Sequence, residues 1–337
     1  MANQTIIGFG EILLRLSVPG RGLLVQANRF DAHAGGAEAN VCVGLARLGH
    51  DTRMVSVLPG NGLGDLARSA LLSAGVDLSS VGTGEGRMGL YFLEPGASLR
   101  PSRIIYDRAA SAFALASPAS FDWPELLAGG SVLHVSGVTA ALGPAGSEAA
   151  LAALAAARSA GVMTSFDANY RAQLWEAWNP DPAPTLRALV EQADLLFGNH
   201  RDISLLLGRP FSGDGPERRR EAAEAAFAAF PNLKHIASTS RHIGHVDCHR
   251  IAARLDTHEH HYQTEELEVA GIVDRIGAGD AFAAGVLHGL ISGAGEAQAV
   301  KDGLALAVLK HSQPGDAALF TAADLAAFGA GSLDVRR

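Results

Sequence analysis

The sequence predicts an α/β fold with a mainly parallel central sheet and a small additional β-sheet. Apolar runs of strand length alternate with helix-length segments along most of the chain, and one stretch of short β-like pieces interrupts them. The composition agrees, because 48% of the 337 residues are hydrophobic and 18% are charged, which allows a large core and disfavours disorder. In such sheets, ligands bind beyond the carboxyl ends of the strands.

The first third of the chain contains the interruption. Strands or β structure are expected at 6–8, 11–17 and 54–58, and helices at 38–48, which ends at Gly49, and at 64–74. The segment 87–105 then carries short β-like pieces with no long helix between them. It predicts a small sheet added to the main body, with strands contributed by about 11–34 and 87–113.

The chain beyond this interruption alternates more regularly. Strands are expected at 131–135, 163–167, 195–197 and 235–239, and helices at 146–159, 184–192, 203–207 and 218–230. Such alternation predicts a parallel sheet covered by helices on both faces. We expect residues 1–337 to form a single domain.

Charge and cysteine content argue against several classes of protein. There are 27 Lys and Arg against 35 Asp and Glu, a net charge of −8, which disfavours a surface for nucleic acid or an anionic membrane. Cys42 and Cys248 imply no disulfide framework, so a reducing cytoplasm is expected. Residues 1–17 carry Glu11 and Arg15 inside an apolar run, unlike a signal peptide, and no uncharged stretch is expected to span a bilayer.

The segment from Asp274 to Gly285 contains the candidate catalytic residues. Gly277, Ala278 and Gly279 precede Asp280, and a helix with an apolar face follows. Glycines let the backbone approach a ligand, and the first N–H groups of a helix attract anions, so phosphoryl oxygens are expected to bind here. Asp280 would lie where an alcohol needs a general base. Taken alone, the four residues also fit a glycine turn with Asp280 as an N-cap.

Two motifs together resemble those of the ribokinase-like (PfkB) carbohydrate kinases. One is Gly277-Ala278-Gly279-Asp280-Ala281-Phe282 with Gly285, and the other is Gly35-Gly36-Ala37-Glu38-Ala39-Asn40-Val41, running on to Gly49. They occur in the family's order, and the resemblance covers nearly the whole chain. It implies a three-layer α/β/α body, a small β-sheet lid, ATP with Mg²⁺, and transfer to a sugar or sugar-like alcohol.

Further motifs resemble those of the 2-keto-3-deoxygluconate kinases. They are Gly10–Ser17, the Glu of Gly-Gly-Ala-Glu-Ala-Asn, Tyr106-Asp107-Arg108, and Asp167-Ala168-Asn169-Tyr170-Arg171. That substrate is a sugar acid whose carboxylate suits a bidentate arginine, so Arg108 and Arg171 are the candidates. The other expected substrate residues are Tyr91 and Tyr106, as hydroxyl donors and an apolar wall, and, by the resemblance, Gly35, Gly36 and Asn40. Solvated arginines and half-buried lid packing are the alternative interpretations.

The resemblance also suggests where ATP and its metal bind. Relatives carry Asn-x-x-Glu after the strand at 195–197, whereas this chain has Asn199 and Asp202, so Asp202 is the candidate for Mg²⁺ through water. An acid in the first turn of a helix is the alternative for Asp202. The expected nucleotide residues are Asn169, Asn199, Ser238, Ser240, Arg241, Gly244 and His311, the last bordering adenine or a monovalent cation such as potassium. Arg275 and Ile276 replace the usual Thr-Thr, so a hydroxyl near the phosphates is lost.

Other functions remain open on the sequence. One alternative is a fructokinase or ribokinase, which would carry out the same phosphoryl transfer on a neutral sugar. A dinucleotide-binding oxidoreductase is disfavoured because Gly8-Phe9-Gly10 lacks the third glycine and the following helix. A sugar sensor on a kinase scaffold is disfavoured by the retained Asp280. His258-Glu259-His260-His261 lacks zinc spacing, so no structural metal is expected. A homodimer through the lid would cover its edges.

Overall fold

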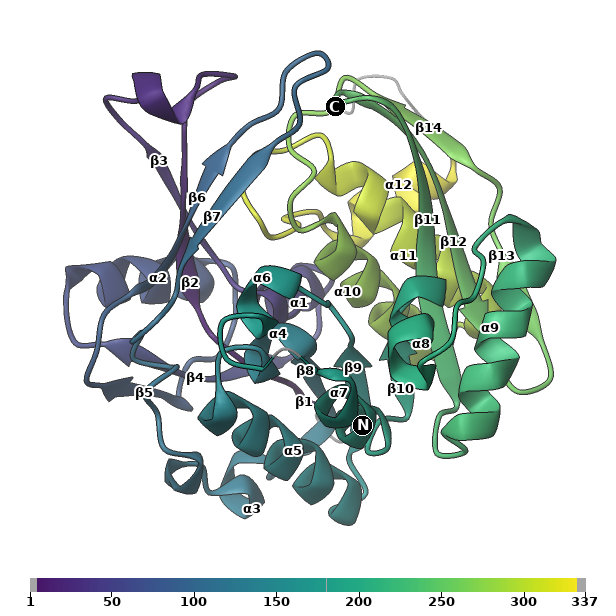
Figure 1. Ribbon diagram of the computed structural model, residues 1–337, viewed down its shortest axis with the longest axis horizontal. Coiled ribbons are helices and arrows are strands. Elements are labelled where there is room, and N and C mark those ends of the chain that lie inside the picture. Colours follow the sequence, from purple (N-terminus) through teal and green to yellow (C-terminus); the bar gives the residue numbers. More distant parts are fainter. Residues whose placement is uncertain (1–4, 180, 332–337) are drawn as a thin grey trace.

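Two β-sheets organise the chain (Figure 1). The computed structural model describes residues 5–179 and 181–331, so the expected domain limits 1 and 337 lie outside the described residues. Within those ranges the large sheet has ten strands and the small sheet has four.

The large sheet is parallel over most of its width. Its order is β13-β12-β11-β10-β9-β8-β1-β4-β5, with β14 also paired to β12. The strands are β1 (Thr5–Phe9), β4 (Thr52–Pro59), β5 (Val81–Gly84), β8 (Gly130–Ser136), β9 (Met163–Asp167), β10 (Leu195–Phe197), β11 (His235–His245), β12 (Cys248–Asp256), β13 (His261–Gln263) and β14 (Leu267–Ala270). From β5 to β11 neighbouring strands pair in parallel, while β12 pairs antiparallel with β11, β13 and β14. The carboxyl ends of the parallel strands therefore meet at one edge.

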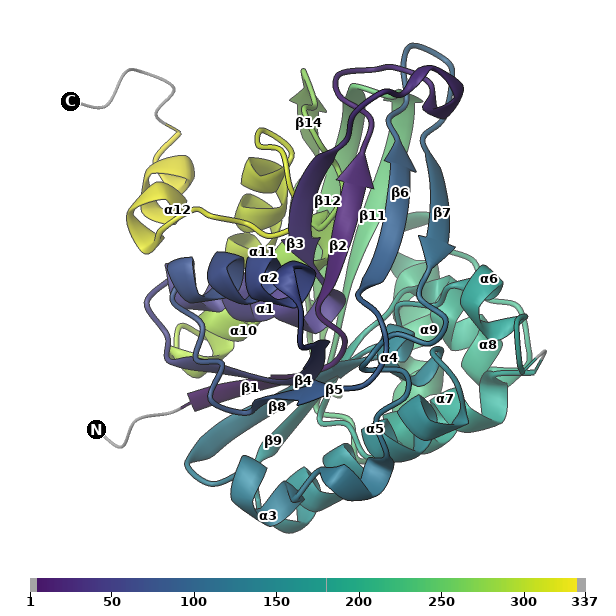
Figure 2. The same cartoon turned by 90° about the vertical axis from the view of Figure 1, so that its left-hand side faces the viewer.

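Helices cover both faces of this sheet and make the three expected layers (Figure 2). One face carries α1 (Ala37–Arg47), α2 (Gly62–Ser73), α10 (Ala278–Ile291), α11 (Glu296–Lys310) and α12 (Ala322–Gly329). The other carries α3 (Trp123–Leu126), α5 (Pro144–Ser159), α7 (Ala183–Val190), α8 (His200–Leu207) and α9 (Gly215–Ala229). Short helices follow two of the central strands, namely α4 (Gly137–Ala140) after β8 and α6 (Ala172–Trp175) after β9, and η1 (Leu24–Gln26) and η2 (Pro118–Ser120) are 3₁₀ turns.

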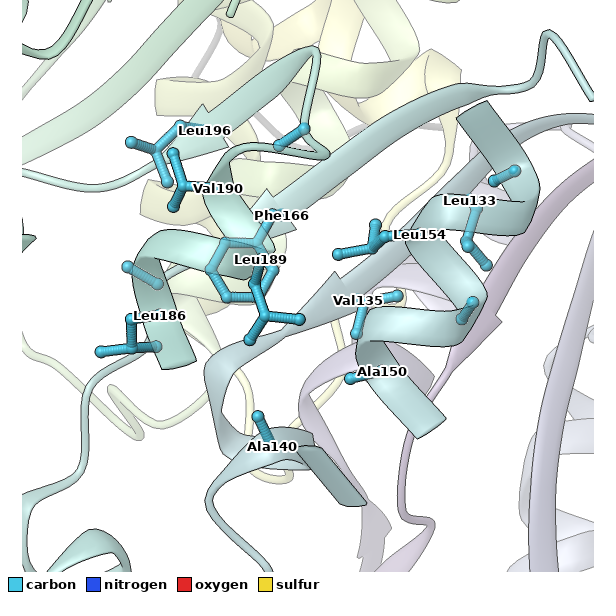
Figure 3. Packing of buried hydrophobic residues seen from close by; sticks show 14 of the residues in the cluster. Leu133, Val135, Ala140, Ala150, Leu154, Phe166, Leu186, Leu189, Val190 and Leu196 are labelled. Atoms are coloured by element: carbon cyan, nitrogen blue, oxygen red, sulfur yellow. The ribbon is translucent and has the colours of Figure 1, made fainter. Parts of the chain in front are cut away.

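Packing between the sheet and α5 and α7 follows from the periodicity of the sequence. Val135 of β8 and Phe166 of β9 belong to one buried cluster with Leu154 of α5 and with Leu186 and Leu189 of α7 (Figure 3). The helical residues repeat every three or four positions and so share a face, while strand residues two apart share a face of the sheet. Each large side chain buried in this way contributes about 1.5–3 kcal/mol to folding. This layer holds the strands whose carboxyl ends carry the site.

The small sheet, called the lid below, has the order β3-β2-β6-β7. Its strands are β2 (Leu13–Ser17), β3 (Asp31–Gly35), β6 (Gly89–Glu94) and β7 (Arg103–Asp107). The pairings β2–β3 and β6–β7 are antiparallel and β2–β6 is parallel, which aligns His33, Arg15, Tyr91 and Tyr106 in one row across the lid. The lid face carrying Tyr91 packs against Ile276, just before α10.

The structure confirms the expected fold class and most of the expected elements. β9 and β10 have the expected limits, whereas β11 continues six residues beyond the expected end at 239. The extension is mostly exposed and polar, so no hydrophobic pattern marks it, and pairing with β12 stabilises it instead. Within residues 5–179 and 181–331, the helices are too short or too polar to cross a bilayer.

Candidate functional site

The candidate residues lie where the carboxyl ends of the central strands, the lid and the start of α10 meet. β9 ends at Asp167, and Asn199 follows β10 after one residue. The charge of Asp280 acts on Asp167, and the charge of Arg171 acts on both, so the segment after β9 and the start of α10 face the same space. The structure thus brings together residues about 110 positions apart in sequence.

The turn before α10 has the shape needed to bind an anion. Gly277 has a left-handed φ of 78°, and a Cβ there would lie 1.6 Å from the main-chain oxygen of Asp316, so this position requires glycine. At Gly279, by contrast, a Cβ would meet no atom within 4 Å, so the backbone borders open space. Gly279 and Asp280 lie in the first turn of α10, where N–H groups have no intrahelical acceptor. These N–H groups can bind phosphoryl oxygens.

Asp280 is the third residue of α10, and Gly277 is its N-cap. The interpretation of Asp280 as an N-cap is therefore wrong. Its Oδ2 accepts a hydrogen bond from Nδ2 of Asn40 at 2.6 Å. Burial raises the pKa of Asp280 to about 7; the Asn40 hydrogen bond and the charge of Arg171 oppose the rise, and the charges of Asp316 and Glu38 add to it. Asp280 is thus a carboxylate that can accept a proton near neutral pH.

Asn40 and its neighbouring glycines connect the lid to α1. Gly36 is the N-cap of α1 with a φ of 137°, and a Cβ there would lie 2.2 Å from the main-chain oxygen of Glu11. A Cβ at Gly35 would lie 2.5 Å from Oδ2 of Asp316. Both glycines are thus explained by close contacts within the protein, and their contact with substrate stays a prediction. The hydrogen bond from Asn40 to Asp280 was not anticipated, because 240 positions separate them.

The segment after β9 supplies a second carboxylate and an arginine. Burial, together with the charges of Asp280 and Asp202, raises the pKa of Asp167 to about 8, and the charge of Arg171 opposes this rise. Asn169 has a φ of 38°, and its N–H donates to Oδ1 of Asp167 at 3.0 Å, which turns the chain sharply. Arg171 is exposed, and its Nη1 donates to the main-chain oxygen of Tyr170 at 3.1 Å. The remaining donors of its guanidinium are available to a ligand.

Asp202 has a structural role that the sequence also suggested. Its Oδ2 accepts from the N–H of Asn199 at 2.8 Å, while the Asn199 side chain accepts from the N–H of Arg201, a capping box at the start of α8. The capping role is compatible with a second role, because a carboxylate oxygen accepts more than one hydrogen bond.

The acids fit a hydrated Mg²⁺. In the described part of the chain, no three His, Cys, Asp or Glu side chains are placed to hold a metal ion. The carboxylates of Asp202 and Asp280 nevertheless both raise the pKa of Asp167, and Arg171 opposes them. A cation that keeps its water ligands relieves this repulsion, and magnesium commonly binds in that way.

The lid offers an aromatic wall and a second arginine. Tyr91 is 6% exposed, and its hydroxyl donates to Oδ2 of Asp316 at 2.6 Å, so protein already uses this hydroxyl. The ring of Tyr106 lies 6.3 Å from that of Tyr91. Arg108 is also 6% exposed and donates through Nε to Glu11, whereas its Nη1 and Nη2 form no hydrogen bond with any described residue. Glu11 therefore orients a guanidinium that retains two free donor groups.

The expected nucleotide residues divide into two groups. Ser238, Ser240 and Arg241 follow one another along β11. Arg241 is exposed, but partial desolvation of its guanidinium together with the charge of Arg275 lowers its pKa. The two arginines have no carboxylate partner among the described residues, so their positive charges are free to bind an anion, and their contact with the phosphates of ATP stays a prediction. Gly244, by contrast, lies at an irregularity near the exposed end of β11, where a Cβ would meet only the main-chain oxygen of Cys248 at 3.5 Å.

His311 is buried behind the loop that precedes α10. Its Nδ1 lies 2.7 Å from the main-chain oxygen of Ala307, and its Nε2 is buried without a partner among the described residues. Burial lowers the pKa of His311, so the ring is neutral near pH 7. Its expected contact with adenine or a cation stays a prediction.

A buried charge network behind the site was not predicted. Arg15 is 1% exposed, and its Nη2 lies 2.6 Å from Oδ2 of Asp274 and its Nη1 3.0 Å from Oδ1 of Asp316. One signal was available, because Arg15 interrupts the apolar strand Leu13–Leu16. Asp316 carried no comparable signal, since its partners Arg15 and Tyr91 lie more than 200 positions away.

Known proteins resemble this chain over most of its length. The model of the pfkB family of carbohydrate kinases matches residues 4–322. The chain is 31% identical over 318 residues to 2-dehydro-3-deoxygalactonokinase of Haloferax volcanii, covering 94% of this chain and 93% of that one. The crystal structure of 2-dehydro-3-deoxygluconokinase from Thermotoga maritima superimposes with a TM-score of 0.92 at 35% identity, covering 97% and 100% of the two chains.

A more distant structure shows the same fold with its ligands. It is a protein described as ribokinase II from E. coli, solved in complex with ATP and Mg²⁺, with a TM-score of 0.82 at 19% identity and coverage of 98% and 100%. At this identity the likeness concerns the fold alone.

Proposed function

Because the chain belongs to the pfkB family of carbohydrate kinases, we propose that it phosphorylates a hydroxyl of 2-keto-3-deoxygluconate or a related sugar acid with ATP. In this proposal Asp280 is the general base. The observation that carries it is the placement of Asp280, whose pKa is about 7, beside the open backbone at Gly279. Phosphoryl transfer from ATP to an alcohol requires a proton acceptor next to a site that binds phosphoryl oxygens.

The proposed reaction is an in-line displacement. The substrate hydroxyl loses its proton to Asp280 as its oxygen forms a bond to the γ-phosphorus, and the bond from that phosphorus to the β,γ-bridging oxygen breaks to release ADP. Asn40 holds the acceptor oxygen of Asp280 in place through the 2.6 Å hydrogen bond. The N–H groups of Gly279 and Asp280 stabilise charge on the transferring group, with Gly277 and Ala278 shaping the turn.

Mg²⁺, when bound with ATP, neutralises charge on the phosphate oxygens. Asp202 would accept hydrogen bonds from water ligands of the ion, and Asp167, whose pKa the charge of Asp202 raises, would add negative charge there. Arg241 and Arg275 would contact the phosphates, and Ser238, Ser240, Asn169 and Asn199 would complete the nucleotide site. Arg275 stands where a Thr is usual in the family, so it supplies a charge in place of a hydroxyl. Gly244 stays a weaker candidate, since it lies near the exposed end of β11, whereas His311 lies close enough to Arg241 for that charge to lower its pKa.

Two arginines support a sugar acid over a neutral sugar. Arg171 is exposed beside Asp280, and Arg108 presents Nη1 and Nη2 free of hydrogen bonds to described residues. Together they would bind a carboxylate with charge-assisted hydrogen bonds, while Tyr106 would form an apolar wall. The relatives named above, which act on 2-keto-3-deoxy sugar acids, support the same substrate class. A fructokinase or ribokinase activity is the alternative, and it would leave both arginines without a substrate partner.

The test is ADP release with Mg-ATP and a panel of acceptors. The panel contains 2-keto-3-deoxygluconate, its galactonate epimer, gluconate, fructose and ribose, with Asp280→Asn as the blank. Turnover confined to the keto-deoxy acids supports the proposal. A preference for fructose or ribose would retain the kinase and exclude the arginine clamp, and turnover equal to that of the blank on every acceptor would contradict the proposed activity.

A dimer and a cytoplasmic location complete the proposal. The lid exposes apolar side chains at its outer end, with Val25 89%, Phe30 40% and Ile105 41% exposed, and a second subunit would cover them. Sedimentation at micromolar concentration tests this, because a monomer would contradict it. The two free thiols, Cys42 and Cys248, suit a reducing cytoplasm.

A further inference from the structure

A lysine ammonium lies buried behind the anion site, at the end of α11. Lys310 is 0% exposed, although lysines are almost never fully buried without partners. Its Nζ donates to the main-chain oxygen of Asp274 at 3.3 Å and to that of Gln313 at 3.2 Å. Burial lowers its pKa, while the negative charges of Asp274, Asp316 and Asp280 oppose this and favour the charged form.

The two carbonyl groups belong to the segments that shape the anion site. Asp274 begins the turn that leads to Gly277, and Gln313 begins the turn that leads to Asp316. These two turns pack directly on each other, since the main-chain oxygen of Asp316 fills the space where Gly277 would carry a Cβ. The Lys310 ammonium therefore joins both sides of this contact one layer behind the backbone that borders the phosphate site.

We propose that the Lys310 ammonium occupies the place of a monovalent cation, and that phosphoryl transfer by this chain is therefore independent of potassium. This inference rests on the proposed function. Main-chain carbonyl oxygens from separate turns are the ligands that replace the hydration shell of a monovalent cation in proteins. Here both carbonyls already accept from a covalently attached cation, and Arg15, within the same network, adds a further positive charge. The potassium ion that the resemblance implies does not fit beside them.

Lys310 acts in this account as a positioning residue, through the turns and not through contact with the substrates. Lys310→Ala removes the ammonium and leaves a cavity lined by the two carbonyl oxygens, into which a small monovalent cation can enter. Lys310→Met fills most of that volume with an apolar chain and admits no cation. Lys301→Ala, on the exposed face of the same helix, is the matched control.

The experiment compares these variants in potassium, ammonium, sodium and tetramethylammonium chloride at one ionic strength. We expect the wild-type kcat/KM to change less than about twofold among salts. The Lys310 ammonium holds the two turns in place in every salt, and the rate depends on the placement of the reacting groups. Lys310→Ala is expected to lose about 10–100-fold in tetramethylammonium and to recover saturably with potassium or ammonium. Lys310→Met is expected to lose as much without recovery, and Lys301→Ala to match the wild type.

Thermal unfolding provides a readout that does not depend on catalysis. The Tm of Lys310→Ala is expected to rise saturably with potassium or ammonium but not with tetramethylammonium, and the wild-type Tm is expected to show no such selectivity. A wild-type enzyme activated severalfold by potassium, or a Lys310→Ala variant whose rate and Tm ignore the choice of cation, would overturn the inference. If no acceptor of the panel is phosphorylated, the Tm measurements still decide whether the Lys310 ammonium occupies the position of a monovalent cation.

Discussion

The hydrogen bond from Asn40 to Asp280 makes a quantitative prediction about pH dependence. The bond lowers the pKa of Asp280, yet burial still raises the net pKa to about 7. Asn40→Ala removes a hydrogen bond to a charged group, which contributes about 1.5–3 kcal/mol, and a water molecule replaces part of it. Since about 1.4 kcal/mol corresponds to one pH unit, the pKa of Asp280 is expected to rise by about one unit.

The direction of the effect on activity follows from the role of a base. Only ionised Asp280 accepts a proton, so kcat/KM falls as pH drops below its pKa. The acid limb of the wild-type profile is expected near pH 7, and that of Asn40→Ala about one unit higher, with a plateau reached at still higher pH. The assay is kcat/KM for the sugar acid from pH 5 to 10 with a coupling system that is not rate-limiting.

A second asparagine provides the control for this experiment. Asn61 is the N-cap of α2, and its side chain accepts from the N–H groups of Leu63 and Gly64. Asn61→Ala is expected to cost about 1 kcal/mol of stability and to leave the pH profile unchanged. An acid limb that stays in place in Asn40→Ala, or moves to lower pH, would refute the reasoning that Asn40 stabilises the carboxylate form of the base.

Further predictions concern the other charged residues of the site. Asp280→Asn is expected to lower kcat by about 10²–10⁴-fold with little change in the KM for ATP, as initial rates will show. Arg171→Ala is expected to lower kcat/KM for the sugar acid by at least about tenfold more than for fructose. Arg275→Thr is expected to raise the KM for ATP, because it removes a positive charge at the phosphates, and an unchanged KM would exclude that contact. The pKa of Asp167 is about 8 in the folded state and ordinary in the unfolded state, so stability falls as pH rises through this interval. Asp167→Asn is therefore expected to raise the Tm more at pH 8 than at pH 5 while lowering activity, which calorimetry and rate assays check.

The parts of the fold that the sequence predicted are those with a local hydrophobic pattern. β9 and β10 are buried apolar runs and had the right limits, whereas β12 was not predicted. That strand contains Arg250 and Arg254 among its apolar residues, and Arg254 is buried because it pairs with Asp256 at 2.6 Å. An ion pair within a strand removes the pattern on which a prediction depends, even though it satisfies the buried charge.

The candidate site also contains residues that a local pattern predicted and residues that depend on contacts between distant segments. Gly277, Gly279 and Asp280 are contiguous, so their arrangement follows from the start of a single helix. The Asp280 partner Asn40 and the network of Arg15 depend on contacts between segments more than 200 positions apart, which no local pattern encodes. The glycines at 35 and 36 were recognised, but their physical reason is packing against Asp316 and Glu11.

The anchoring of the lid has a consequence for attempts to change substrate preference. Arg15 and Tyr91 are lid residues, yet their partners Asp274 and Asp316 lie on either side of α10 and α11, in the body. Exchanging the lid strands with those of a relative would leave these buried carboxylates without their arginine and tyrosine, which destabilises a protein strongly. The four residues are far apart in sequence but depend on one another, so an engineered lid has to be transferred together with both acids.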